Sequence, residues 1–256
     1  MKYGKKPAAP QPSDLRFGNY VDRPSLPALP DTFGHGDLFP TREWGVLGND
    51  DWGDCGPAGE DHAEKVLTTL GGNPAPFTTE TAEALYSAVT GFDPQAGPPG
   101  ENPTDQGTDI HALARYRRKT GAVDANGRYH RIGAYVWLEP GNWEELLYGT
   151  YLFQVAGIGW ELQEAQERQF QNNETWDYEE GSPVVGGHWT ISPEKERLVS
   201  WGTLCPFTQK LYEKQNDEGL VYISREVIVD GKDPNGFRAK QLFADLELLD
   251  TVAIAA

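Results

Sequence analysis

Apolar side chains recur at helical spacing through the first part of the chain and form short strand-like runs later. After Gly56, the residues Ala63, Val66 and Leu70 share one face of a helix. The same spacing predicts helices over 56–70, 79–90, 108–120, 143–153 and 236–249. Strand patterns lie over 130–138, 187–192, 197–202 and 220–224. Helices first and strands afterwards predict an α+β fold, with a helical lobe packed against an antiparallel β-sheet lobe.

The first 40 residues lack this periodicity and contain seven prolines. Such a composition is typical of an extended arm, which is disordered unless a surface holds it. The surface could belong to the rest of the chain or to a partner. We therefore divide the chain into an arm over 1–40, a main domain over 41–230 and a C-terminal helical segment over 231–256.

Composition excludes several classes of protein. The formal net charge of −17 over 256 residues argues against nucleic-acid binding, because no basic face would offset phosphate repulsion. No apolar run approaches the roughly 20 residues of a membrane span. The stretch 1–14 is basic and has no apolar core, so we expect no secretion by a signal peptide. The two cysteines, Cys55 and Cys205, are expected to be free thiols, with Cys205 filling space in the core.

Cys55 lies in the segment Gly53-Asp54-Cys55-Gly56-Pro57, at the predicted start of the first helix. The partial positive charge of a helix N-terminus favours a thiolate, which is the nucleophilic form of cysteine. Asp54 is a candidate cap for this helix. A buried structural cysteine at a tight turn is the alternative interpretation of Cys55, and without a partner histidine it is favoured.

His188 is the candidate partner. It follows two glycines and opens a hairpin whose second strand ends in Val199-Ser200-Trp201-Gly202. Glycines before the histidine allow backbone or substrate to approach closely. An imidazole beside a thiol can accept its proton and so activate it. A histidine with an ordinary packing role is equally compatible with this residue taken alone.

Cysteine at a helix start, Gly-His on a later strand and Ser-Trp-Gly on the next strand together resemble the papain-like cysteine peptidases. The resemblance runs from about Trp44 to Ser224. It implies a two-lobed papain-like fold with a cleft between the lobes, Cys55 as nucleophile and His188 as base. It further implies that Asn49, with the backbone N–H of Cys55, holds the oxyanion. The implied cleft residues are Gly53, Gly56, Gly107, Gly187 and Trp201.

The chain departs from that family's pattern at its proposed site. Val199 stands where an Asn usually orients the histidine ring, and valine has no side-chain hydrogen-bonding group. Asn49 replaces a longer Gln, and Gly56 replaces an aromatic residue. The hairpin after His188 is shorter than usual, so a one-residue slip would turn this side chain to the other face. A lost oxyanion donor alone costs about 10²–10³ in rate, so weak or vestigial activity is one expectation.

A narrower set of motifs resembles poorly characterised proteins encoded by bacteriophages and some bacteria. These motifs include residues 47–50, 86–94, 105–109, 116–121 and 186–188. The likeness implies a virion component, assembled in the host cytoplasm and attached to capsid or neck proteins through the arm. No Walker loop, dinucleotide glycine pattern, zinc signature or EF-hand is present, so we expect no cofactor and no metal.

Three functions remain open. A structural or decoration protein of a phage particle is weighed slightly above an active cysteine hydrolase that cuts peptide or isopeptide bonds, because a fold alone does not establish function. An adaptor that binds a peptide without cutting it lies between these two.

Overall fold

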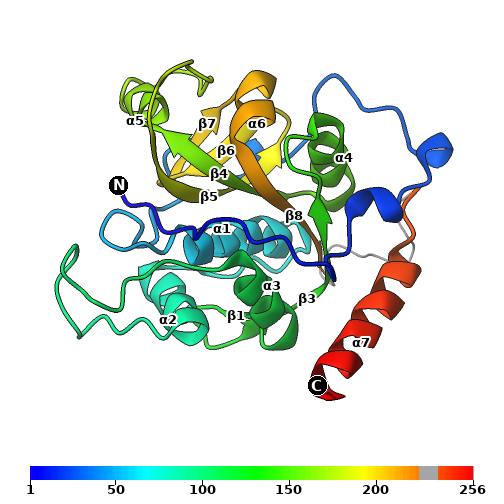
Figure 1. Ribbon diagram of the computed structural model, residues 1–256, viewed down its shortest axis with the longest axis horizontal. Helices are drawn as coiled ribbons and strands as arrows, with labels where there is room; N and C mark the ends of the chain where they lie inside the picture. Colours follow the sequence, from blue (N-terminus) through cyan, green and yellow to red (C-terminus); the bar gives the residue numbers. More distant parts are fainter. Residues whose placement is uncertain (225–235, 256) are drawn as a thin grey trace.

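The computed structural model describes residues 1–224 and 236–255, and these form a helical lobe and a sheet lobe (Figure 1). The helical lobe contains α1 (Cys55–Leu70), α2 (Thr79–Thr90) and α3 (Ile110–Lys119). A small two-stranded sheet joins it, made of β1 (Ala122–Val123) and β2 (Tyr129–His130). The α+β class and the two-lobed arrangement predicted from the sequence are confirmed.

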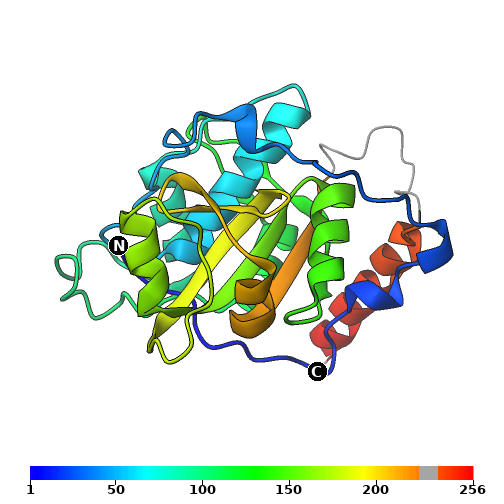
Figure 2. The ribbon, with the colours of Figure 1, turned by 90° about the horizontal axis from the view of Figure 1, so that it is seen from above.

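The sheet lobe is built on six antiparallel strands in the order β3-β8-β4-β5-β6-β7. Their bounds are β3 Ile132–Leu138, β4 Ala156–Gln163, β5 Val184–Glu194, β6 Arg197–Ser200, β7 Thr203–Pro206 and β8 Asn216–Ser224. The helices around them are α4 (Trp143–Phe153), α5 (Glu164–Gln171), α6 (Gln209–Gln215) and α7 (Ala239–Ala255). Figure 2 shows β4, β5 and β8 side by side at the centre of the molecule.

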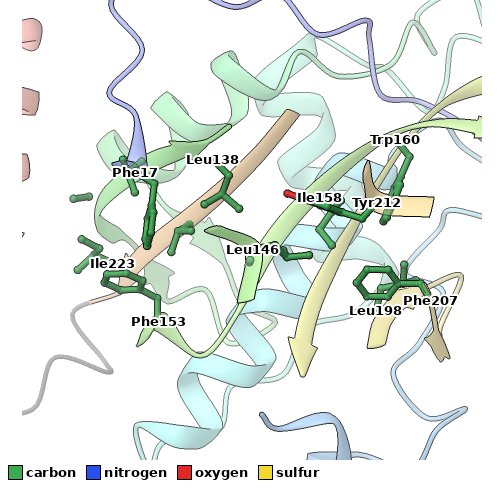
Figure 3. Packing of buried hydrophobic residues seen from close by; sticks show 14 of the residues in the cluster. Phe17, Leu138, Leu146, Phe153, Ile158, Trp160, Leu198, Phe207, Tyr212 and Ile223 are labelled. Carbon is green, nitrogen blue, oxygen red and sulfur yellow. The ribbon is translucent and has the colours of Figure 1, made fainter. Parts of the chain in front are cut away.

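Alternation along the strands produces two hydrophobic cores, one on each face of the sheet. On β8, Leu220 and Tyr222 face the core shared with α1 and α3, whereas Val221 and Ile223 face the other core. Figure 3 shows part of the second core, in which Leu146 and Phe153 of α4 pack with strand residues. Because the first core joins α1 to β5, it fixes the first helix against the strand that bears His188.

The helices over 79–90 and 143–153 begin and end where the sequence predicts, and α1 and α3 differ from the prediction by one or two residues. The last helix, α7, begins and ends later than predicted, and α5 and α6 were not predicted. The central strand β4 has no counterpart in the sequence analysis. Its residues Gly157 and Gly159 weaken the strand signal, because glycine favours strands poorly. At Gly157 the glycine is required by packing, since a Cβ there would overlap the ring of Trp189.

The arm contains three short 3₁₀ turns (Phe17–Asn19, Arg23–Ser25 and Gly36–Leu38) and contacts the body at several separate positions. Isolated bridges join Lys5 to Thr108 and Arg16 to Trp137, and Gly34 to Glu194. The surface that holds it is therefore the chain's own body. The domain limits given above stay predictions, and the one near residue 230 lies outside the described residues.

Candidate active site

Cys55 is the first residue of α1 and is buried, with 2% of its surface exposed. The N–H groups of a first helical turn have no acceptor within the helix, so the backbone N–H of Cys55 is available for a ligand. Asp54 precedes it at the N-cap position, but its side chain makes no capping hydrogen bond. The expected capping role of Asp54 is therefore wrong: this carboxyl is buried, and burial raises its pKa well above the usual range.

His188 lies on β5 with its ring stacked on Trp201, at 4.5 Å between ring centroids. Its Nε2 shares a hydrogen bond of 2.9 Å with Oγ of Ser200. Within the described residues, its Nδ1 has no hydrogen-bond partner. The ring is thus oriented by one nitrogen and leaves the other free for chemistry.

Cys55 and His188 line one small cavity of about 10 Å³, together with Asn49, Val199 and Ser200. This volume is at the lower limit of what can hold a single water molecule. The structure therefore brings the three predicted catalytic residues to one place, from the start of α1, from β5 and from the loop before α1.

The ring-orienting role is filled by a residue that the sequence analysis did not assign. Val199 is buried in the core and pairs with Ile191 across the β5–β6 hairpin. The next residue, Ser200, reaches the imidazole instead. Ser200 belongs to the Ser-Trp-Gly motif, so the residue itself could be noticed in the sequence. Its contact with His188 depends on the strand register, which the sequence does not determine.

Asn49 is buried beside this cavity, and its side-chain amide donates to the carbonyl of Trp52 at 3.0 Å. Its own backbone carbonyl accepts a hydrogen bond from the N–H of Lys2. The Asn49 side chain also lies near the buried carboxyl of Asp54 and favours its charged form.

The cleft between the lobes is filled by residues 2–6, which we call the cleft segment. In Figure 1 this dark blue stretch runs between the helical lobe and the sheet lobe. The backbone N–H groups of Gly4 and Lys5 both donate to the carbonyl of Gly187, at 3.2 and 3.0 Å. On the other side, Thr108 donates to Gly4 at 2.6 Å and accepts from Lys6 at 2.9 Å. The segment is therefore held by both lobes through its backbone.

Two of the predicted cleft glycines, Gly107 and Gly187, are required by the closeness of this segment, and Gly53 lies close to it. A Cβ on Gly107 or on Gly187 would overlap the backbone of Gly4 or of Lys5. A Cβ on Gly53 would lie 3.1 Å from the carbonyl oxygen of Tyr3.

Trp201 donates from its indole N–H to the carbonyl of Lys2 at 3.4 Å, so it also borders the segment. Gly56 instead faces Thr108 and Leu113, and a Cβ at this position would lie 3.2 Å from each of them. Gly56 therefore serves the packing of α1 on α3.

Tyr3 covers the imidazole from outside. Its ring meets the rings of His188 and Trp201 edge-on, each at 6.1 Å between centroids, and its hydroxyl donates to Glu167. The backbone N–H groups of Trp189 and Gly4 lie near the sulfur of Cys55 and favour its charged form. The segment thus lies directly over both candidate catalytic groups.

Burial governs the charge state of the pair in this closed form. It raises the pKa of the Cys55 thiol to about 11, although the two N–H groups at the sulfur act in the opposite direction. It lowers the pKa of His188 to about 3. Both groups are consequently neutral at pH 7.

Cys55 and Cys205 are both buried free thiols, as expected. Among residues 1–224 and 236–255, no three His, Cys, Asp or Glu side chains are grouped so that they could hold a metal ion. No described helix combines the length and apolar character that a membrane span needs.

Solved structures with the same fold are cysteine proteases. Xylellain of Xylella fastidiosa superimposes with a TM-score of 0.65 at 12% identity, over 87% of this chain and 96% of that one. Procathepsin B S9 of Trypanosoma congolense gives 0.57 at 11% identity, over 88% and 87% of the two chains. A cysteine protease of Carica candamarcensis gives 0.53 at 12% identity, over 77% and 99%.

No family model matches the chain, and no curated protein matches it. The similarity to the three solved structures shows that the fold is that of the papain-like cysteine proteases.

Proposed function

We propose that the chain is a cysteine peptidase or amidase that its own cleft segment keeps closed. The observation that carries this proposal is the cavity shared by Cys55 and His188, with one nitrogen of the imidazole bonded to Ser200 and the other unpaired. The arrangement contains a nucleophile, a base and a group that orients the base. The cysteine-protease fold supports the same assignment.

The chemistry follows from these positions. His188 accepts the thiol proton of Cys55, and the sulfur attacks the carbonyl carbon of the substrate. The backbone N–H of Cys55 and the amide of Asn49 stabilise the oxyanion. The imidazolium then protonates the leaving amine, which departs as the acyl-thioester forms, and water hydrolyses the thioester in a second step with His188 again as base.

The closed form is inactive for a physical reason. With the thiol and the imidazole both neutral, little thiolate exists at pH 7. Departure of the cleft segment would rehydrate both groups and return each pKa towards its ordinary value. The helix N-terminus would then favour the thiolate.

The test uses the full-length chain with Gly4→Ala. A Cβ at this position would overlap the backbone of Gly53, so the cleft segment cannot keep its place. We expect this variant to cleave peptides of a mixed library, detected by mass spectrometry, whereas Lys6→Ala, a change at an exposed side chain, leaves the protein closed.

Adding Cys55→Ser to Gly4→Ala should reduce cleavage by about 10³-fold or more, because loss of one member of a catalytic unit removes most of the activity of the whole unit. Circular dichroism verifies that each variant is folded. A folded Gly4→Ala protein that cleaves nothing, or cleaves equally well without Cys55, would reject the proposal.

A non-catalytic virion component is the second candidate. The filled cleft and Val199 at the usual place of an orienting Asn favour it, together with the likeness to phage-encoded proteins. In that role the body would dock on capsid or neck proteins through the arm. If so, the protein should be found in purified particles, and Cys55→Ser should leave its amount there unchanged; its absence from particles would exclude the role.

A further inference from the structure

The side chain of Lys5 enters an acidic pocket beside the candidate catalytic pair. Its exposure is 0%, and its Nζ lies 2.7 Å from Oδ2 of Asp217 and 3.1 Å from Oε1 of Glu218. A third bond runs to the carbonyl of Lys6 at 3.0 Å. All three donors of the ammonium group are therefore used.

A β-bulge builds this pair of carboxylates. Gly159 of β4 lies opposite Glu218, and the next residue of β4, Trp160, lies opposite Asn216. Asp217 is thus the extra residue of β8. Neighbours on a regular strand point to opposite faces, whereas a bulge re-aims one of them. Because of the bulge, Asp217 and Glu218 reach the same cation.

A glycine in the wall of the pocket leaves space for the long side chain of Lys5. A Cβ on Gly159 would lie 3.0 Å from Cδ of Lys5 and 2.7 Å from Cγ of Glu218. Any larger residue at this position of β4 would force the lysine or the carboxylate to move. Gly159 therefore leaves the space that the side chains of Lys5 and Glu218 occupy.

Charge decides what this pocket accepts. Removal from water makes a buried carboxylate costly unless a cation accompanies it. Burial favours the neutral form of Lys5, but the charges of Glu218 and Asp217 outweigh it and raise the pKa of Lys5. Burial also raises the pKa of Glu218 to about 7, and the charge of Lys5 opposes this shift, so a cationic side chain at this place favours the charged form of the carboxyl.

Elsewhere the segment is held largely through its backbone, apart from Tyr3, whose ring packs on His188 and Trp201, and Gly4, where a Cβ would overlap the backbone of Gly53. Gly187 and Thr108 bond only to backbone atoms of the cleft segment. Backbone bonds give affinity for any extended peptide, and side-chain pockets give selectivity. We propose that Asp217 and Glu218 form the specificity pocket of the cleft, which selects a lysine or arginine side chain of a peptide bound in place of the cleft segment. This inference rests on the proposed peptide-binding function of the cleft.

Binding of labelled peptides tests the pocket without any cleavage. The receptor is the full-length chain with Gly4→Ala and Cys55→Ser, and the probe is a fluorescent peptide with the sequence of residues 1–6. A matched probe has norleucine, which is uncharged and similar in length, in place of the lysine at position 5. We expect the lysine probe to bind about 10-fold or more tightly, because hydrogen bonds to charged groups contribute that much.

Asp217→Asn combined with Glu218→Gln in this receptor should abolish the preference, leaving the two probes about equal in affinity. Equal binding of both probes before these changes would overturn the inference. A preference that survives in the Asp217→Asn/Glu218→Gln receptor would overturn it as well.

A second pair of variants avoids dependence on Gly4→Ala. In an otherwise unchanged chain, Lys5→Met weakens the hold of the cleft segment, whereas Lys6→Met changes an exposed neighbour. We expect the lysine probe to bind the Lys5→Met protein about 10-fold or more tightly than the Lys6→Met protein. Equal binding would contradict the proposal. A lysine preference in a protein whose Cys55 shows no hydrolytic activity would reject the proposed enzyme and still support the pocket.

Discussion

At the scale of residues, burial holds the two candidate catalytic groups in their neutral forms. Only about 1% of His188 is exposed, and its ring is enclosed by Trp201, Tyr3 and Ser200. In the unfolded chain the same imidazole titrates near its ordinary pKa of about 6.5. Folding therefore opposes protonation of this side chain.

This difference predicts an acid-dependent loss of stability. Between the lowered pKa of about 3 and the unfolded value, the unfolded state binds a proton that the folded state does not. The contribution of His188 is thus fully present above the unfolded pKa and falls as the pH decreases below it. From pH 7 to pH 5 the loss should be about 2 kcal/mol.

Chemical denaturation of the wild type and of His188→Gln at both pH values isolates this group, because other titrations are common to the two proteins. The expectation is that the wild type loses about 2 kcal/mol more than the variant. Parallel losses in the two proteins would show that the imidazole is not shielded from water.

The sequence contained the identities of these residues but not their contacts. Cys55 and His188 could be singled out from their motifs, and the structure places them around one cavity. Ser200 could not be assigned, because Val199 stands at the position where the family's orienting residue is expected. Lys5 would be taken from the sequence alone for a solvated side chain, because lysine is rarely buried unless it is paired.

At the scale of elements, an ion cluster fixes α1 to its neighbours. Arg117 of α3 is fully buried and bonds to Glu60 and Glu64 of α1. Glu60 also accepts from the indole N–H of Trp189 on β5, at 3.2 Å, and from the hydroxyl of Tyr222 on β8. Since Trp189 adjoins His188 in the chain, the cluster connects the helix that bears the thiol to the strand that bears the imidazole.

Arg117→Met should therefore be strongly destabilising. Removal of one partner from a buried ion pair leaves uncompensated charge and costs about 3–5 kcal/mol. The matched control is Arg115→Met on the exposed face of the same helix, which should change stability by less than about 0.5 kcal/mol. Unfolding in urea measures both, and equal midpoints for the two variants would show that the cluster does not hold the lobes together.

Elements with regular apolar spacing were predictable, and elements shaped by packing were not. The helices over 79–90 and 143–153 follow from their periodicity alone. The central strand β4 escapes prediction because Gly157 and Gly159 are selected by neighbours distant in sequence, Trp189 for the first and the acidic pocket for the second. The bulge at Asp217 likewise depends on pairing between strands.

At the scale of the whole molecule, the two lobes enclose a segment of their own chain. An extended N-terminal arm could be predicted from its prolines, but not the surface on which it lies. Gly4 has no side chain from which a packing role could be predicted. The structure shows that glycine is needed here because the backbone of Gly53 lies directly against it. The proposed function depends on one relation, in which the cleft segment covers a thiol that becomes reactive once the segment leaves.

Alkylation of Cys55 by iodoacetamide at pH 7 tests that relation most directly. All proteins carry Cys205→Ser, so that a single thiol reacts. We expect the closed parent protein to react more slowly than free cysteine, and the Gly4→Ala protein to react about 10-fold or more faster than free cysteine because the thiolate is then favoured. Addition of His188→Gln should remove this gain. A Gly4→Ala protein whose thiol reacts no faster than free cysteine, or reacts equally fast without His188, would contradict the account.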